Sequence, residues 1–220
     1  MKKLLLAGVA CILSAGAAVA APILSAGTIS SGGLTFSNFT CTSPGGIGLN
    51  AGGCGTIDVA GSGSGLAIST LLQTAAGGGG PVVSALDVVI GYQVTATTAL
   101  SSIGLNFNGA VTGPVGEAQV REQVFADAAR SILIGQGLVS VAAGVFATTI
   151  NLSPSVLTAY VTKDIQLSSF SIGERLTVSS ISTIGQPFQP TPVPEPATLA
   201  LFGTALLGLG VARRRNRKQA

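Results

Sequence analysis

The sequence lacks several residue types on which protein chemistry most often depends. Its 220 residues include no histidine and no tryptophan, and Tyr92 and Tyr160 are the only tyrosines. Without histidine the chain has no Ser-His-Asp triad, lacks the commonest general base and misses a ligand of most zinc enzyme sites. An aromatic platform for stacking sugars is also poorly supplied. We therefore expect a protein that is not an enzyme and that holds no metal and no cofactor.

Charged residues are also scarce, at 9% of the sequence, and the two signs are distributed differently. Seven of the eleven Lys and Arg residues lie among the first three or the last eight residues. All eight acids lie between residues 21 and 196, together with only four bases, so this central region has a net charge of −4. A nucleic-acid partner would need a basic patch on the folded body, and the composition excludes one.

The eight acids are scattered, and most stand beside a base or on an apparent outer strand face. Asp164 follows Lys163, for example, and Glu174 precedes Arg175. We interpret these side chains as solvated surface charges. Two carboxylates could nevertheless catalyse glycoside cleavage if the fold placed them across a groove, so a polysaccharide-modifying hydrolase stays open as an alternative.

The first 20 residues have the three parts of a secretory signal peptide. Lys2 and Lys3 form the positive start, residues 4–13 form the apolar segment, and Ala18-Val19-Ala20 is a small-residue cleavage motif. The expected cleavage separates Ala20 from Ala21.

Export places the body in an oxidising compartment, where thiols tend to pair. Once the signal peptide is removed, Cys41 and Cys54 are the only cysteines left, and we expect a disulfide between them. The intervening loop is rich in glycine, and closing it contributes about 3 kcal/mol in the chain-entropy treatment.

Residues 21–186 are expected to form a mainly β, antiparallel, sandwich-like domain with Gly-rich loops. Alternating apolar and polar residues at 86–95, 102–108 and 157–167 are typical of half-buried strands. Further strands are expected at 34–40, 56–60, 65–72, 131–141, 145–152 and 176–184. Residues 117–133 fit both a helical stripe and a strand, and we favour the strand.

The C-terminal region divides into three expected segments. Residues 187–196 are a proline-rich linker, and residues 197–212 form an apolar run that would span about 24 Å as a helix. This is short but workable for a bilayer with about 30 Å of hydrocarbon. Residues 213–220 are a basic tail that would stay cytoplasmic, in which the charges are Arg213, Arg214, Arg215, Arg217 and Lys218.

Pro194, Glu195 and Pro196, the apolar run and the arginine cluster occur in this order at the end of the chain. Together they resemble the PEP-CTERM sorting signal of Gram-negative bacteria that make extracellular polysaccharide. The resemblance implies that an exosortase, a membrane-embedded enzyme, recognises this region and cleaves near the Pro-Glu-Pro motif. It covers about the last 28 residues and carries no information about the body.

These observations favour an exported protein with a structural or interaction role. It would be anchored in the inner membrane as a precursor and then sorted to the cell surface or the extracellular matrix. Its low charge and its many Ser, Thr and Gly residues suit association with a hydrated exopolysaccharide. Besides the hydrolase, a permanently anchored periplasmic-side protein remains an alternative.

Overall fold

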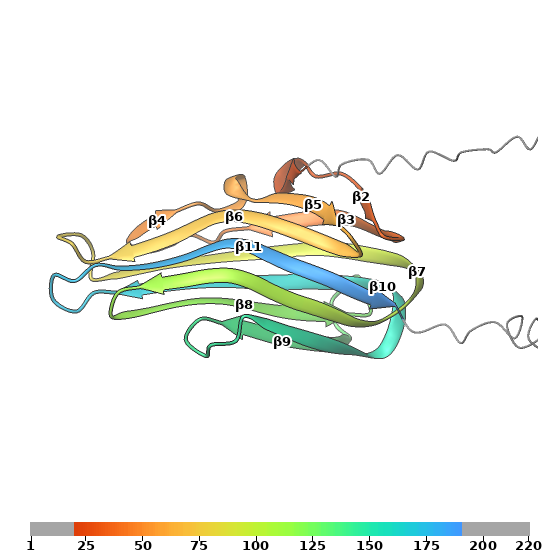
Figure 1. Cartoon of the computed structure of the whole chain (residues 1–220). Helices are drawn as coiled ribbons and strands as arrows, with labels where there is room; N and C mark the ends of the chain where they lie inside the picture. Colours follow the sequence, from red (N-terminus) through yellow and green to blue (C-terminus); the bar gives the residue numbers. More distant parts are fainter. Residues whose placement is uncertain (1–19, 191–220) are drawn as a thin grey trace, which may run out of the picture. The chain divides into compact units, whose positions relative to one another are not determined.

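Alternating apolar and polar residues run through most of the body and form strands (Figure 1). The computed structural model describes residues 20–190. The predicted signal peptide up to residue 19, the Pro-Glu-Pro motif, the apolar run and the basic tail lie outside the described residues. In order, the elements are β1 (Ala21–Pro22), η1 (Ile23–Ser25), β2 (Ile29–Ser31), β3 (Leu34–Thr42), β4 (Leu49–Ala51), η2 (Cys54–Thr56), β5 (Asp58–Ser62), β6 (Gly65–Ala76), β7 (Val83–Thr112), β8 (Val115–Phe125), β9 (Leu133–Ser140), β10 (Ala147–Phe170) and β11 (Thr177–Pro190). Within residues 20–190, no helix has the length and apolarity that a membrane span requires.

All eleven strands belong to one antiparallel sheet. Its main order is β1-β5-β6-β11-β7-β10-β8-β9, with β2, β3 and β4 paired at its sides. The sheet folds over on itself because its two longest strands take part in both layers. The first half of β7 pairs with β3 and with the second half of β10, and its second half pairs with β11 and with the first part of β10. Figure 1 shows β6 and β11 in one layer and β8 and β9 in the other.

The mainly β, antiparallel prediction is confirmed, but the strands are longer and more continuous than expected. The strands predicted at 86–95 and 102–108 are both part of β7, and those at 145–152 and 157–167 are both part of β10. Residues 96–101 contain no glycine or proline, so nothing ends β7 there. In β10, a register shift between Asn151 and Val156 accommodates Pro154 without ending the strand.

The ambiguous stretch 117–133 forms a strand and a turn, as favoured. β8 ends at Phe125, and the Asp127 carboxylate then closes the turn by accepting hydrogen bonds from the backbone N–H groups of Ser131 and Ile132, at 3.0 and 2.7 Å. A side-chain carboxylate that binds backbone groups a few residues ahead stabilises a turn instead of a helix. The next strand, β9, pairs with β8 in an antiparallel hairpin.

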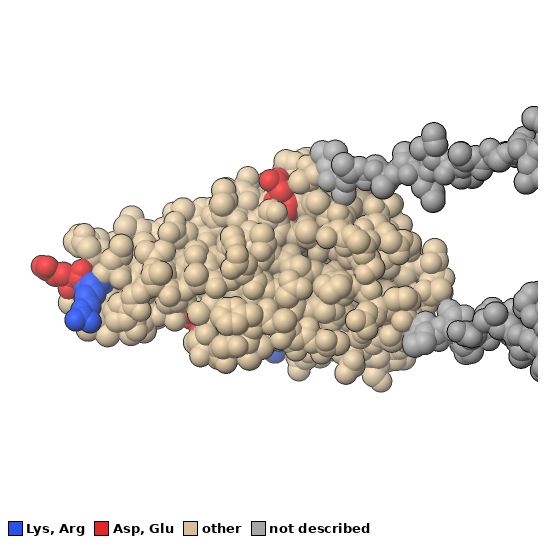
Figure 2. All heavy atoms as spheres, viewed as in Figure 1, with Lys and Arg blue, Asp and Glu red and all other residues tan. Residues whose placement is uncertain are grey.

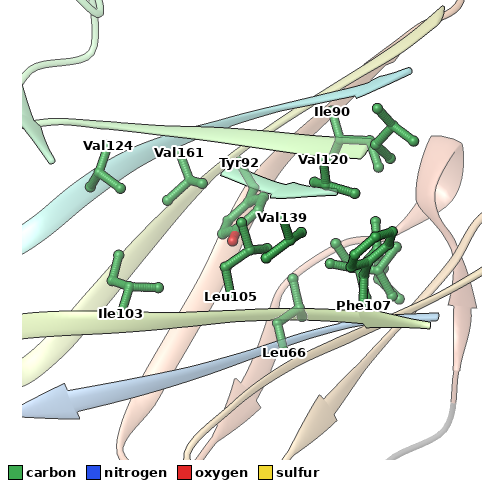
Figure 3. Packing of buried hydrophobic residues seen from close by; sticks show 14 of the residues in the cluster. Leu66, Ile90, Tyr92, Ile103, Leu105, Phe107, Val120, Val124, Val139 and Val161 are labelled. Carbon is green, nitrogen blue, oxygen red and sulfur yellow. The ribbon is translucent and has the colours of Figure 1, made fainter. Parts of the chain in front are cut away.

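One hydrophobic core fills the space between the layers. It includes the aromatic ring of Tyr92, which lies 6.2 Å from Phe36 between ring centroids, and Phe36 in turn lies 5.4 Å from Phe188. In Figure 3, Tyr92 lies among the aliphatic side chains of this cluster, with its hydroxyl group inside it. The predicted disulfide is present, and it joins Cys41 of β3 to Cys54 of η2 with a Cα–Cα distance of 5.7 Å.

The last described strand extends into the segment that was expected to be a linker. β11 continues to Pro190, so it overlaps residues 187–190 of the predicted linker. Gln186 and Phe188 are each only 1% exposed. The prolines in this segment are tolerated in the strand, and the burial of Phe188 against Phe36 holds the segment in the sheet.

Candidate functional site

Two polar groups stand out in this sheet: one inside the fold and one on its outer surface. The inner group is formed by Lys163 of β10 and Glu122 of β8, which are directly opposite in register. Both side chains are fully buried and form an ion pair. This corrects the interpretation of the charges as solvated surface groups, which is wrong for these two residues.

The inner group also includes an amide and a phenol. Gln186 of β11 donates a hydrogen bond from its side-chain nitrogen to Glu122 Oε1, and Tyr92 of β7 donates its hydroxyl to Gln186 Oε1. Lys163 Nζ donates to the other carboxylate oxygen, Glu122 Oε2. These four residues, Tyr92, Glu122, Lys163 and Gln186, are called the buried polar cluster below. They connect β11 in one layer to β7, β8 and β10 in the other.

Burial shifts the protonation equilibria of the cluster toward neutral groups. Removal from water raises the pKa of Glu122, although the adjacent Lys163 charge opposes this shift. Desolvation likewise lowers the pKa of Lys163 against the opposing effect of Glu122. It also raises the pKa of Tyr92, and the Glu122 charge adds to that increase. Burial therefore brings the pKa values of Glu122 and Lys163 closer together than those of the free side chains.

The outer group lies on the opposite face of the same strands. Outward-facing residues of neighbouring strands lie in rows across the sheet. In one such row, Gln166 of β10 pairs with Gln119 of β8 on one side and with Asp87 of β7 on the other. The Gln119 amide donates to Gln166 at 2.8 Å, and the Gln166 amide donates to Asp164 at 3.0 Å. We call the face formed by the outward residues of β7, β8, β9 and β10 the glutamine face.

The glutamine face continues over several further rows. Gln123 pairs with Gln136 of β9 and with Thr162 of β10. Beyond them, Tyr160 pairs with Phe125, and both side chains are half-buried. The second of the two tyrosines therefore lies beside an apolar ring, on the same face as the amides.

Two open hollows adjoin on the glutamine face. One measures about 420 Å³ and is lined by residues that include Arg121, Gln136 and Asp164. The other measures about 370 Å³ and is bordered by Asp87, Glu117 and the glycine-rich loop at Ile47. Both hollows share Gln119 and Gln166. The rim at Ile47 belongs to the loop that the Cys41–Cys54 disulfide closes.

Asp87 and Asp164 are neighbours on this face. Burial and the negative charge of Asp164 raise the pKa of Asp87. Among the residues that the structure describes, Asp87 Oδ1 is buried without a hydrogen-bond donor. Asp87 therefore holds a proton more readily than an ordinary aspartate does.

Other charged groups are few on the surface. Figure 2 shows one face of the molecule with very few charged side chains. Glu117, which borders the second hollow, accepts hydrogen bonds from Ser140 Oγ at 2.9 Å and from the backbone N–H of Ala118 at 3.1 Å. Across residues 20–190, no three potential metal-ligating side chains of His, Cys, Asp or Glu gather at one place.

Sequence reasoning missed the buried polar cluster, although a signal for it was present. Lys163 has the same parity as Val161 and Ile165, and Glu122 has the same parity as Val120 and Val124. In a strand, residues of equal parity share a face. The four flanking residues are fully buried, so Lys163 and Glu122 were placed inward by the same alternation that identified the strands. The sequence could not show that Gln186 of a distant strand meets them.

The C-terminal prediction was tested by comparison with known families. Residues 192–216 match the PEP-CTERM protein-sorting motif, which confirms the resemblance at Pro194, Glu195 and Pro196. The match includes residues 213–215 of the basic cluster, and Arg217 and Lys218 follow it. The motif implies an exported protein whose precursor is anchored in the membrane by its C-terminal segment. It also implies that an exosortase processes this precursor. No curated protein sequence matches the chain.

Proposed function

We propose that this protein is a non-catalytic component of the cell surface or extracellular matrix that binds a hydrated, mostly uncharged polysaccharide through the glutamine face. The observation that carries the proposal is the aligned set of side-chain amides across β8, β9 and β10, bordered by Tyr160. Exosortase processing would release the body from its membrane anchor and deliver it to that polymer.

The chemistry of the face suits sugar hydroxyl groups. Each glutamine amide offers two donors and an acceptor, and each sugar hydroxyl can both donate and accept. The hydrogen bonds from Gln119 to Gln166 and from Gln166 to Asp164 hold two of these amides in position before binding. Because the side chains stand on strands, little order has to be gained when a polymer binds.

The charge of the body favours a neutral polymer over an acidic one. The described residues contain seven acids and four bases. The buried polar cluster removes one of each sign from the surface, which leaves six acids and three bases exposed to a ligand. A polyanion would be repelled by this surface at low ionic strength.

The positions of the carboxylates support a binding role over hydrolysis. Glycoside hydrolases separate their two catalytic carboxyl groups by about 5–9.5 Å so that a sugar or a water fits between them. Asp164 instead accepts a hydrogen bond from the Gln166 amide, and Asp87 Oδ1 is buried, so both carboxyl groups are engaged with the sheet. Glu117, the other acid beside a hollow, is occupied by backbone and serine donors.

Affinity electrophoresis of the purified protein tests the binding proposal. We expect retardation in gels that contain dextran or hydroxyethyl cellulose and none in gels with alginate, a polyanion. Gln119→Ala with Gln166→Ala should abolish the retardation. The matched control is Gln73→Ala, which removes an exposed glutamine of β6 outside this face. Equal retardation of all variants, or none of the wild type, would contradict the proposal.

The location of the protein tests the proposed route. In the native host we expect a form that begins near Ala21, ends near Pro196 and is found outside the cell. Without the exosortase, the full C-terminal segment should be retained in the membrane fraction. A full-length, membrane-bound protein in both strains would instead support a permanent anchor.

A further inference from the structure

The buried polar cluster has no part in the proposed binding function, because none of its four side chains reaches the surface. Lys163 and Glu122 are 0% exposed, and Tyr92 and Gln186 are each 1% exposed. A buried ion pair is a weak way to stabilise a fold, since the desolvation of two charges offsets most of their attraction. An amine, a carboxyl group, an amide and a phenol in contact and shielded from water therefore suggest a chemical role.

The contacts place these four groups in an order that suits acyl transfer. The two oxygens of a single carboxylate, that of Glu122, bind Lys163 Nζ on one side and Gln186 Nε2 on the other. The amine and the amide nitrogen are thereby both bound to one carboxylate. On the far side of the amide, the Tyr92 hydroxyl donates to the carbonyl oxygen of Gln186, which draws electron density from the carbonyl carbon.

We propose that Lys163 and Gln186 become joined by an intramolecular isopeptide bond, formed by the protein itself with the release of ammonia. Glu122 would act as the proton carrier and Tyr92 as the oxyanion donor. The bond would link β10 to β11 and so fasten the two layers of the sheet together at their centre. The proposal uses no residue of the glutamine face and does not depend on polysaccharide binding.

The reaction begins when the Lys163 proton passes to Glu122, which leaves a neutral amine beside a neutral carboxylic acid. The lone pair of Nζ then attacks Cδ of Gln186 and forms the new C–N bond, while the carbonyl electrons move onto Oε1. Glu122 gives its proton to Nε2 and takes one from Nζ. The bond between Cδ and Nε2 breaks, its electron pair stays on nitrogen, and ammonia leaves.

The overall change is balanced and needs no further reactant. A primary amine and a primary amide become a secondary amide and ammonia, and no atom changes its oxidation state. Glu122 ends the cycle as a carboxylic acid. The step removes the buried ion pair and replaces it with neutral groups, which a buried site accommodates better. Loss of ammonia to solution drives the reaction forward.

Peptide mass spectrometry tests the proposal. The full-length chain is exported in a host that lacks an exosortase, and it is then denatured and digested with trypsin. Trypsin has few sites here, because the bases between residues 122 and 212 are Arg130, Lys163 and Arg175. An acylated Lys163 resists trypsin. We therefore expect a branched product that joins residues 131–175 to the peptide beginning at Leu176, lighter than their sum by one ammonia.

Variants identify the role of each group. Lys163→Arg keeps the positive charge, supplies no primary amine and provides its own trypsin site, so it should yield separate peptides 131–163 and 164–175. Glu122→Gln keeps the shape of the carboxyl group but cannot carry the proton, and it should give unlinked chains. Tyr92→Phe should slow linkage. Gln73→Ala, which removes an exposed glutamine outside both the cluster and the glutamine face, should leave the branched product unchanged.

The wild-type protein decides the question even if a variant fails to fold. Complete cleavage after Lys163 in the wild type would overturn the proposal. A branched product that has lost water instead of ammonia, with the link at Glu122, would also overturn it, because a different bond would have formed. Conversion of Gln186 to glutamate without a link would do the same.

Discussion

Lys163 and Asp164 are neighbours in β10, yet they lie in opposite environments. Lys163 is fully buried in the polar cluster, whereas Asp164 stands on the glutamine face, where its carboxylate accepts a hydrogen bond from Gln166. One step along a strand reverses the face. In this protein, the face of the strand on which a polar residue lies determines its role more than its chemical type does.

Substitutions in the buried polar cluster should have the largest effect on the free energy of unfolding. Relative to the protein in which Lys163 and Gln186 are not linked, Lys163→Ala leaves the Glu122 carboxyl group buried without its counter-ion, and loss of one partner of a buried pair costs about 3–5 kcal/mol. Urea denaturation should show this loss. The double variant Lys163→Met with Glu122→Leu removes both polar groups and should recover a large part of it. A double variant no more stable than Lys163→Ala would contradict this view.

The disulfide comes next in expected size. Cys41→Ser with Cys54→Ser should lower the free energy of unfolding by about 3 kcal/mol, because the glycine-rich loop is no longer closed in the unfolded chain. The same variant should weaken polysaccharide binding, since this loop borders one hollow of the glutamine face. Denaturation of the oxidised and reduced wild-type protein provides the matched measurement. Equal midpoints would contradict the prediction.

Two aspartates should respond to pH in opposite directions. The pKa of Asp87 is raised above its ordinary value of 3.8 by burial and by Asp164, so the folded state holds that proton more tightly than the unfolded state. Its contribution to stability therefore grows as pH falls from neutral through the raised pKa toward 3.8. The pKa of Asp127 is lowered, mainly by the backbone N–H of Ile132. Its contribution is present above 3.8 and is lost as pH falls through the lowered pKa.

Thermal unfolding between neutral pH and pH 3 separates these two contributions. Asp87→Asn should remove the gain that appears on acidification, and Asp127→Asn should reduce the loss below the ordinary aspartate pKa. Asp87→Ser or Asp87→Ala serves as a control for any hydrogen bond that the asparagine amide of Asp87→Asn would add. If Asp87→Asn left the pH profile unchanged, the carboxyl contact with Asp164 would not perturb the proton equilibrium as described.

Substitutions on the glutamine face should have the smallest effect on stability. Gln119→Ala with Gln166→Ala should change the free energy of unfolding by no more than about 0.5 kcal/mol per residue, as is usual for surface substitutions. The same change is expected to abolish polysaccharide binding. A loss of stability comparable to that of Lys163→Ala would mean that the glutamine face holds the fold together instead of forming a binding surface.

Much of the fold could be read from alternation, and the exceptions have physical causes. The predicted β strands are present because residues such as Val88, Ile90 and Tyr92 share one face. β7 and β10 were each predicted as two strands. In β10 the predicted break fell at Pro154, but a register shift against β7 keeps the strand continuous, and a local pattern does not show such a shift. The extension of β11 to Pro190 was missed for a related reason, since Phe188 is ordered by contact with the remote Phe36.

The sorting motif, the alternating strands and the pairing of Cys41 with Cys54 could all be recognised from the order of the residues alone. Each depends on residues close together in the chain or on cysteines with no other partner. Only the tertiary structure decided that Gln186 and Tyr92 meet the Lys163–Glu122 pair, and that glutamines from β8, β9 and β10 form one surface. These contacts join strands that are distant in the sequence. The strands meet through strand pairing and the folding of the sheet, and local sequence patterns do not encode either.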